Sequence, residues 1–221
     1  MTSKGEALLL DFWASPFCAR AKISLYEKGV NFECREEDLF GGKSDLLLRS
    51  NPIHQKVPVL LHNGKPILES TNIVTYIDAV WPSPPLIPSS PYEAAQARFW
   101  ADFIDKKVFD AGSQIWRSQG DEQEVAKKNF IEILQQLEEA LGNKKFFAGD
   151  VFGFVDILLI PITSWFLTYE KIGSFKVEDR VPKLSAWIKR TKQRETVAKA
   201  LPDPEKVYEF IVGMRKQLGI E

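Results

Sequence analysis

A hydroxyl and a thiol stand three residues apart in Ser15-Pro-Phe-Cys18, near the start of the chain. This is the spacing of a redox Cys-x-x-Cys motif, but the first position is a serine, so the pair cannot cycle as a dithiol. Ser15 followed by Pro16 is typical of a helix start, with Ser15 as the N-cap and the proline at the first helical position. Backbone N–H groups and the positive end of the helix dipole converge there. A hydroxyl at that point can donate a hydrogen bond to an anion.

The other side chains suited to nucleophilic or metal chemistry are few. The chain holds two cysteines, Cys18 and Cys34, and two histidines, His54 and His62. These are too few for a disulfide framework or a zinc cluster, so we expect no metal site and a reducing, cytoplasmic setting. We expect both histidines at the surface or in loops.

Composition excludes two classes of partner. The 221 residues include 29 basic and 30 acidic side chains, so no field is available to attract nucleic acid. The longest apolar stretch, residues 157–162, is much shorter than the roughly 20 residues that span a bilayer. We therefore expect a globular protein that binds neither nucleic acid nor a membrane.

The first eighty residues alternate strand and helix signals. A short apolar run predicts a strand, Ser15-Pro16 opens a helix that Gly29 closes, and Asn63-Gly64 is the dipeptide that a tight hairpin turn prefers. The order is βαβ, a short helix, then ββα, and its parts are strand 7–13, helix 15–29, strand 30–36, a short helix ending near 51–52, strands 57–62 and 65–68, and helix 70–81.

The second part of the chain predicts helices only. Residues 82–91 hold five prolines, which indicates a semi-rigid linker. Beyond it, residues 152–172 are apolar all round and predict one central buried helix. The first long helix has two apolar stripes, so we expect it to bury both; they are Phe99 and Phe103, and Trp100, Ile104 and Val108. The predicted fold class is α/β followed by all-α, with domains at 1–82 and 92–221 and a linker at 83–91.

Several motifs follow one another through essentially the whole chain. They are Asp11-Phe-Trp-Ala-Ser-Pro-Phe17, Asn51-Pro-Ile-His-Gln-Lys-Val-Pro-Val-Leu60, His62-Asn-Gly-Lys-Pro66, Glu69-Ser70, Tyr76-Ile-Asp78, Gly149-Asp150, Asp156-Ile157 and Leu201-Pro-Asp-Pro-Glu-Lys-Val-Tyr-Glu-Phe210. In this order and at this spacing the chain resembles the tau class of plant cytosolic glutathione transferases. This resemblance implies a thioredoxin-like domain that carries a glutathione site, a helical domain that forms most of an acceptor pocket, and a homodimer.

The same resemblance implies the reaction. Reduced glutathione would be conjugated to apolar electrophiles, and organic hydroperoxides would be reduced, in detoxification and the stress response. Ser15 would stabilise the thiolate, with glutathione as co-substrate and no further cofactor. Two alternatives stay open: a non-catalytic carrier of apolar ligands, and a glutathione-dependent thiol reductase that uses Cys18.

The glutathione contacts are implied residue by residue. Glu69 would hold the ammonium of the tripeptide, and Ser70, at a helix start, the neighbouring carboxylate. Lys43 and Lys56 would neutralise the glycyl carboxylate. The backbone of Val57, before a cis proline, would pair with the cysteinyl unit. Taken alone, Ser15 could equally be only a cap, the Glu-Ser pair a surface turn and each lysine a solvated charge.

Two further features complete the expectations. Cys18 stands where the tau pattern commonly has glycine, and it is either a buried structural thiol or a site of mixed disulfide formation. Asp156, in an apolar helix, resembles a buried acid whose role is folding. The acceptor pocket should be apolar, and its candidates are Phe12, Phe17, Ile115, Trp116, Trp165, Tyr169 and Phe210.

Overall fold

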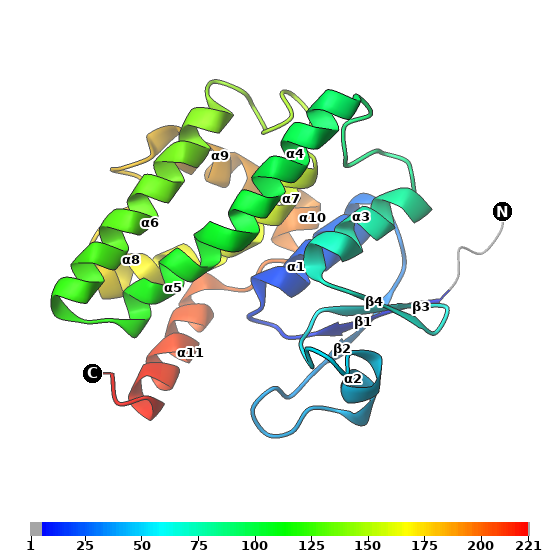
Figure 1. Cartoon of the computed structure of the whole chain (residues 1–221), viewed down its shortest axis with the longest axis horizontal. Coiled ribbons are helices and arrows are strands. Elements are labelled where there is room, and N and C mark those ends of the chain that lie inside the picture. The colour runs from blue at the N-terminus through cyan, green and yellow to red at the C-terminus, as the bar shows by residue number, and fades with distance from the viewer. Residues whose placement is uncertain (1–5, 221) are drawn as a thin grey trace. The chain divides into compact units, whose positions relative to one another are not determined.

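The computed structural model describes residues 6–220. The chain divides into two compact units, Met1–Ile87 and Pro88–Glu221. The first unit combines strands and helices, and the second is built from helices (Figure 1). This is the predicted fold class, a thioredoxin-like domain followed by a helical domain.

The first unit has a four-stranded sheet in the order β2-β1-β3-β4. β1 pairs in parallel with β2 and antiparallel with β3, and β3 pairs antiparallel with β4. The predicted order βαβ-α-ββα is confirmed, and the elements are β1 Ala7–Asp11, α1 Pro16–Glu27, β2 Glu33–Glu36, α2 Asp45–Ser50, β3 Val59–His62, β4 Lys65–Leu68 and α3 Ser70–Val80.

Both faces of the sheet are covered because alternate residues of β1 and β3 point to opposite sides. Leu9 and Leu60 belong to a buried cluster with residues of α1 and α3. Leu10 and Val59 belong to a second cluster, which includes Leu47 of α2. This explains why β1 is a nearly continuous run of apolar residues. Its last residue, Asp11, lies just before the turn that leads to α1.

One expectation from the local sequence, the hairpin turn, and one from the family resemblance, the cis bond before Pro58, are confirmed. Asn63 and Gly64 have φ values of 52° and 74°, so the β3–β4 turn uses the left-handed region that this dipeptide tolerates. The Val57–Pro58 peptide bond is cis, as is Ser83–Pro84.

The beginning of the proline-rich segment is fastened to the first unit. Asp78 of α3 accepts hydrogen bonds from the amides of Leu86 at 2.8 Å and Ile87 at 3.1 Å. The Lys28 side chain is fully buried, and its Nζ lies 2.6 Å from Asp78 Oδ1. Lys28 also donates to the carbonyl of Pro84. One buried ion pair thus ties residues 84–87 to α1 and α3.

The second unit contains α-helices, one π-helical turn and one 3-10 helix. They are α4 Pro91–Phe103, the π-helical turn Ile104–Val108, α5 Phe109–Arg117, α6 Gly120–Leu141, α7 Phe154–Leu159, the 3-10 helix Ile160–Trp165, α8 Phe166–Gly173, α9 Pro182–Lys192, α10 Glu195–Ala198 and α11 Pro204–Gln217.

The single helix predicted over residues 152–172 is wrong in one respect, because it is interrupted by the 3-10 helix. Pro161 has no N–H to donate to the preceding turn, so the α-helical ladder cannot pass through it. The buried hydroxyls of Thr163 and Ser164 donate to the carbonyls of Ile160 and Pro161, at 2.7 and 2.6 Å.

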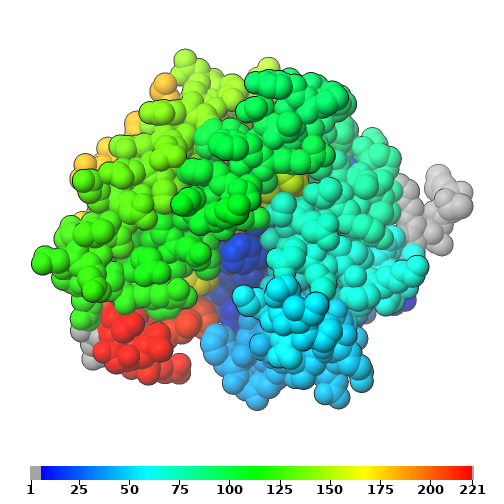
Figure 2. Space-filling view, in the orientation of Figure 1, coloured from blue at the N-terminus to red at the C-terminus, as the bar shows by residue number. Residues whose placement is uncertain are grey.

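The prediction that both stripes of the first long helix are buried is also wrong for this chain. Ile104 and Val108 are buried, but Phe99 is 59% exposed. Tyr92, about two helical turns before Phe99 on α4, is 73% exposed. Figure 2 shows the green surface of α4 open to the viewer. Within residues 6–220, no helix is both long and apolar enough to cross a bilayer.

Candidate active site

Ser15 is the N-cap of α1, as predicted. Its Oγ accepts a hydrogen bond from the amide of Cys18 at 3.2 Å, and Pro16 is the first helical residue. A backbone hydrogen bond from Ser15 N to Phe12 O at 2.9 Å closes the turn between β1 and α1. Ser15 is half-buried. Because its oxygen is the acceptor in the bond from Cys18 N, that bond does not use the hydroxyl proton.

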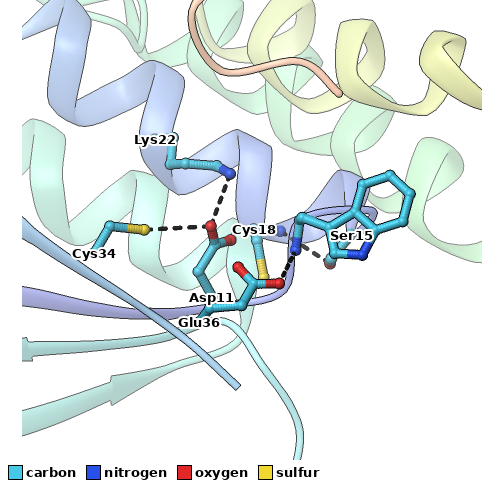
Figure 3. A network of polar contacts seen from close by, with 7 residues as sticks. Asp11, Ser15, Cys18, Lys22, Cys34 and Glu36 are labelled. Carbon is cyan, nitrogen blue, oxygen red and sulfur yellow. Dashed lines mark hydrogen bonds and ion pairs between the residues drawn. The ribbon is translucent and has the colours of Figure 1, made fainter. Parts of the chain in front are cut away.

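A polar network of Asp11, Lys22 and Cys34 lies next to this turn (Figure 3). Asp11 Oδ2 accepts from Lys22 Nζ at 2.8 Å and from Cys34 Sγ at 3.2 Å. Burial opposes the charge on Lys22, but Asp11 outweighs it and raises the pKa of the ammonium. Burial and the Asp11 carboxylate together raise the pKa of Cys34 to about 12. The ion pair ties the end of β1 to the middle of α1.

Cys18 is fully buried in the first turn of α1. Burial, and then the nearby Asp11 carboxylate, raise the pKa of its thiol well above the ordinary value, against a smaller lowering by Ser15. A nucleophilic cysteine needs an accessible thiolate, so neither cysteine has the environment of a reactive one.

Glu69 and Ser70 stand at the start of α3. Glu69 has a φ of 67°, an unusual left-handed conformation for a residue with a side chain, and its carboxylate is exposed. Ser70 is buried, and its Oγ accepts a hydrogen bond from Arg20 Nη1 at 3.0 Å. Arg20 is fully buried on α1 and also lies 4.9 Å from the centre of the Phe17 ring. Arg20 therefore connects the starts of two helices that carry candidate residues.

The remaining candidates for glutathione binding lie on two loops. Lys43 is exposed and directly precedes Ser44, the N-cap of α2. Lys56 is exposed and precedes the cis bond, and its carbonyl accepts from Asn51 Nδ2 at 2.9 Å. Val57 is half-buried. The first unit thus carries a carboxylate and two hydroxyls at the starts of α1 and α3, and two cations in the loops before α2 and β3.

Comparisons with known proteins match both units. Residues 6–79 match the family described as "Glutathione S-transferase, N-terminal domain", and residues 99–213 match "Glutathione S-transferase, C-terminal domain". Glutathione S-transferase U19 of Arabidopsis thaliana is 59% identical over 213 residues, which cover 96% of this chain and 97% of that protein. Probable glutathione S-transferase parC of Nicotiana tabacum is 55% identical over 218 residues, 98% of each chain.

Solved structures agree. Rice GST1 (OsGSTU1), in complex with glutathione, superposes with a TM-score of 0.94 at 48% identity and covers 98% of this chain and 99% of its own. The tau-class enzyme MiGSTU from mango, Mangifera indica, gives a TM-score of 0.89 at 40% identity, covering 94% and 98%. The chain belongs to the tau class of glutathione S-transferases.

In this transferase, the apolar candidates differ in exposure. Phe12 and Phe17 of the first unit are half-buried, and the Phe12 ring lies 6.0 Å from Phe40, which is 66% exposed. The sequence did not suggest Phe40 as a candidate for the acceptor pocket, because it is an isolated aromatic residue in a polar, glycine-rich loop with no periodic pattern.

The helical unit of the transferase holds the other five candidates. Ile115 and Tyr169 are fully buried, Trp116 and Trp165 nearly so, and Phe210 is half-buried. The Tyr169 ring packs directly on Gly112, where an added Cβ would lie 2.3 Å from Tyr169 Cε2. Tyr169 also contacts Phe130, ring to ring, at 5.4 Å.

Asp156 has the structural role expected of it in this family. It is fully buried at the start of α7 and accepts from Phe147 N at 3.1 Å, Trp187 Nε1 at 2.8 Å and Gly153 N at 3.1 Å. Burial raises its pKa to about 6, although all three hydrogen bonds oppose the rise. The carboxylate joins α7 to α9 and to the turn before α7.

The two histidines of the transferase differ. His54 is exposed, with Nε2 3.9 Å from Glu69 Oε1. The expectation of a surface or loop position is wrong for His62, which is buried in β3 with Nδ1 2.8 Å from the Tyr76 hydroxyl. Among the residues the structure describes, no three histidine, cysteine, aspartate or glutamate side chains gather as metal ligands would.

Proposed function

We propose that the hydroxyl of Ser15 donates a hydrogen bond to the sulfur of glutathione and stabilises its thiolate. The observation that carries the proposal is that Ser15 Oγ already accepts from Cys18 N at the start of α1, which leaves its proton for a ligand. A free thiol has a pKa of about 8.5, and lowering it by roughly two units makes the thiolate dominant at neutral pH. That shift corresponds to about 2.7 kcal/mol, within reach of a charge-assisted hydrogen bond and a helix terminus.

Five other residues would hold the tripeptide in this proposal. Glu69 pairs with its ammonium, and Ser70 binds the adjacent carboxylate at the start of α3. Lys43 and Lys56 neutralise the glycyl carboxylate, and the backbone of Val57 pairs with the cysteinyl unit. The rice relative that is 48% identical is described in complex with glutathione, which supports a tripeptide site in this chain.

The thiolate then attacks an apolar electrophile, and the sulfur–carbon bond forms as the leaving group departs. With a hydroperoxide, two glutathione molecules are oxidised to the disulfide while the peroxide is reduced to an alcohol and water. Apolar side chains would bind the acceptor, and the candidates remain those of the sequence: Phe12, Phe17, Ile115, Trp116, Trp165, Tyr169 and Phe210.

The test replaces Ser15 by alanine and measures the ultraviolet absorbance of bound thiolate against pH. We expect the pKa of bound glutathione to rise and kcat to fall by about tenfold or more, with little change in glutathione affinity. Ser90→Ala is a matched control, because Ser90 also precedes a proline at a helix start and has no side-chain cap bond. Unchanged turnover in Ser15→Ala would refute the role.

The reductase alternative loses support from the site. Cys18 is buried and its thiol pKa is raised, so it is poorly placed to form a mixed disulfide with glutathione. The assay against mixed disulfides, run with Cys18→Ser beside the wild type, tests this directly. We expect no disulfide reductase activity that depends on Cys18.

We also propose that the protein is a cytoplasmic homodimer that associates through α4. Tyr92 and Phe99, seven residues apart on one side of this helix, are the most exposed large apolar residues there. Phe99→Asp should convert a dimer to a monomer in light-scattering measurements, whereas Val125→Asp, at an exposed position on α6, should leave the mass unchanged. A monomeric wild type would contradict this part of the proposal.

A further inference from the structure

Two consecutive glutamates stand at the end of β2. Glu36 is the last residue of the strand, and Glu37 follows it, with its amide donating to the carbonyl of Asp11 at 2.9 Å. Successive side chains along an extended segment point to opposite sides. The two carboxylates therefore reach different segments of the first unit, and each of those segments carries a candidate residue of the glutathione site.

Glu36 holds the turn that ends in Ser15. Its Oε1 accepts a hydrogen bond from the amide of Trp13 at 2.7 Å (Figure 3). Trp13 lies inside the turn between β1 and α1, which the bond from Ser15 N to Phe12 O closes. A carboxylate acceptor makes this a charge-assisted bond to the backbone two residues before Ser15. It therefore restrains the position of the Ser15 hydroxyl.

Glu37 holds the corner that carries Lys43. It is only 3% exposed, and its two oxygens accept from Ser44 N at 3.1 Å and from Ser44 Oγ at 2.8 Å. Ser44 Oγ in turn accepts from Leu47 N at 3.0 Å and caps α2. Since Lys43 is bonded directly to Ser44, the buried carboxylate fixes the backbone from which the lysine extends.

We propose that Glu36 and Glu37 are positioning residues with separate tasks: Glu36 sets the sulfur chemistry through Ser15, and Glu37 sets the affinity for the glycyl carboxylate of glutathione through Lys43. The inference rests on the proposed roles of Ser15 and Lys43. It adds that two neighbouring side chains at the end of one strand control two different kinetic constants.

A purely structural role for either glutamate would lower the fraction of folded enzyme. Apparent kcat would then fall, while KM for glutathione and the pKa of bound glutathione would stay unchanged in the molecules that remain folded. The charged groups around Glu36 are Asp11 and Lys22, which form an ion pair with each other, so loss of Glu36 removes a bond to the backbone rather than a partner of a buried cation. A raised pKa of bound glutathione in the Glu36 variant, and a raised KM for glutathione in the Glu37 variant, therefore distinguish positioning from a loss of folded enzyme.

The first experiment compares Glu36→Ala with Glu36→Gln. Loss of the acceptor in Glu36→Ala should raise the pKa of bound glutathione and lower kcat by about fivefold to tenfold, with KM for glutathione changed by less than about twofold. Glu36→Gln should restore both quantities, because its amide oxygen still accepts from Trp13 N. Glu33→Ala is the matched control: Glu33 lies on the same strand, and its exposed carboxylate pairs with Arg35.

The second experiment uses Glu37→Ala. We expect KM for glutathione to rise by about fivefold or more, with the pKa of bound glutathione unchanged. If this variant does not fold, Glu37→Gln replaces it, because one amide oxygen can keep one of the two bonds to Ser44, and a smaller rise in KM alone is expected. Thermal unfolding of every variant confirms that it is folded at the assay temperature.

The outcomes separate this inference from the proposed function. If Ser15→Ala raises the pKa of bound glutathione but Glu36→Ala does not, only the inference fails. If Ser15→Ala leaves that pKa unchanged, the role of Ser15 itself fails. Parallel changes of kcat and KM in both glutamate variants, no recovery in Glu36→Gln, or an equal effect of Glu33→Ala would each overturn the division of tasks.

Discussion

Arg20 Nη1 donates a hydrogen bond to Ser70 Oγ over 3.0 Å, and both side chains are buried. The bond spans fifty residues of sequence and fixes the start of α3 against α1. A serine proposed to bind the carboxylate of glutathione is thus oriented by a cation that sits behind it. Because the guanidinium is planar and always charged, it can hold Ser70 while it stacks near Phe17.

Arg20→Lys should therefore weaken glutathione binding although the charge is kept. A lysine has one compact ammonium and no rigid fork, so it cannot reproduce both contacts. We expect KM for glutathione to rise roughly tenfold, as measured by steady-state kinetics. Arg49→Lys, at an exposed position in the last turn of α2, is the control and should behave as the wild type.

Asp156 should give the folded state a characteristic pH dependence. Its pKa is about 6 in the folded protein against an ordinary 3.8, so between these values the folded state keeps a proton that the unfolded state has released. The stability contributed by this group is therefore fully present below about pH 4 and is lost as pH rises to about 6, by up to roughly 3 kcal/mol.

Urea unfolding of Asp156→Asn and wild type at several pH values from 4 to 7 measures this effect. The amide cannot titrate, so the wild type should lose stability relative to the variant as pH rises through this window. The variant also carries a constant loss of about 1–3 kcal/mol, since its NH₂ group faces an amide donor of Gly153. A difference between the two proteins that is flat with pH would contradict the raised pKa.

Two glycines in helices should respond oppositely to alanine. At Gly112 of α5 a Cβ would lie 2.3 Å from the Tyr169 ring, so Gly112→Ala must displace a fully buried aromatic side chain. We expect a loss of about 1–3 kcal/mol. At Gly213 of α11 nothing lies within 4 Å of the added atom, and alanine should stabilise the helix by about 0.5–1 kcal/mol. Thermal and urea unfolding measure both.

The two cysteines should resist alkylation in the native protein. Cys18 is buried, and with a pKa of about 12 the Cys34 thiol is ionised to only about one part in ten thousand at pH 8. Iodoacetamide labelling followed by mass spectrometry should therefore be slow at both sites and become fast in urea. Asp11→Asn should accelerate the labelling of Cys34, because it removes the negative charge beside the thiol. Rapid native labelling of Cys34 would contradict its assigned environment.

The features that were predictable from sequence are those set by neighbouring residues. Ser15-Pro16 marks a helix start because capping and proline geometry act within one turn, and Asn63-Gly64 marks a hairpin for the same reason. The apolar run of β1 predicts a buried strand because both faces of the sheet are covered. The family resemblance added the cis bond before Pro58, which the local sequence alone does not specify.

The features that were not predictable depend on contacts across the fold. A buried arginine such as Arg20 departs from the usual helix pattern, and its partner Ser70 is far away in sequence. The pairing of Glu36 with Trp13 follows from the alignment of β2 beside β1, which no local motif encodes. The break at Pro161 was visible in the sequence, but the apolar residues around it outweighed the missing N–H in the prediction.

The fastening of residues 84–87 by Lys28 and Asp78 has a consequence for protein engineering. A chimera that grafts the second half of a relative onto this chain should be joined after Ile87, because Leu86 and Ile87 supply the donors that Asp78 needs. With a junction at Pro82, residues of the relative would replace Leu86 and Ile87 as donors to Asp78. They would also replace Pro84, whose carbonyl accepts from the buried ammonium of Lys28.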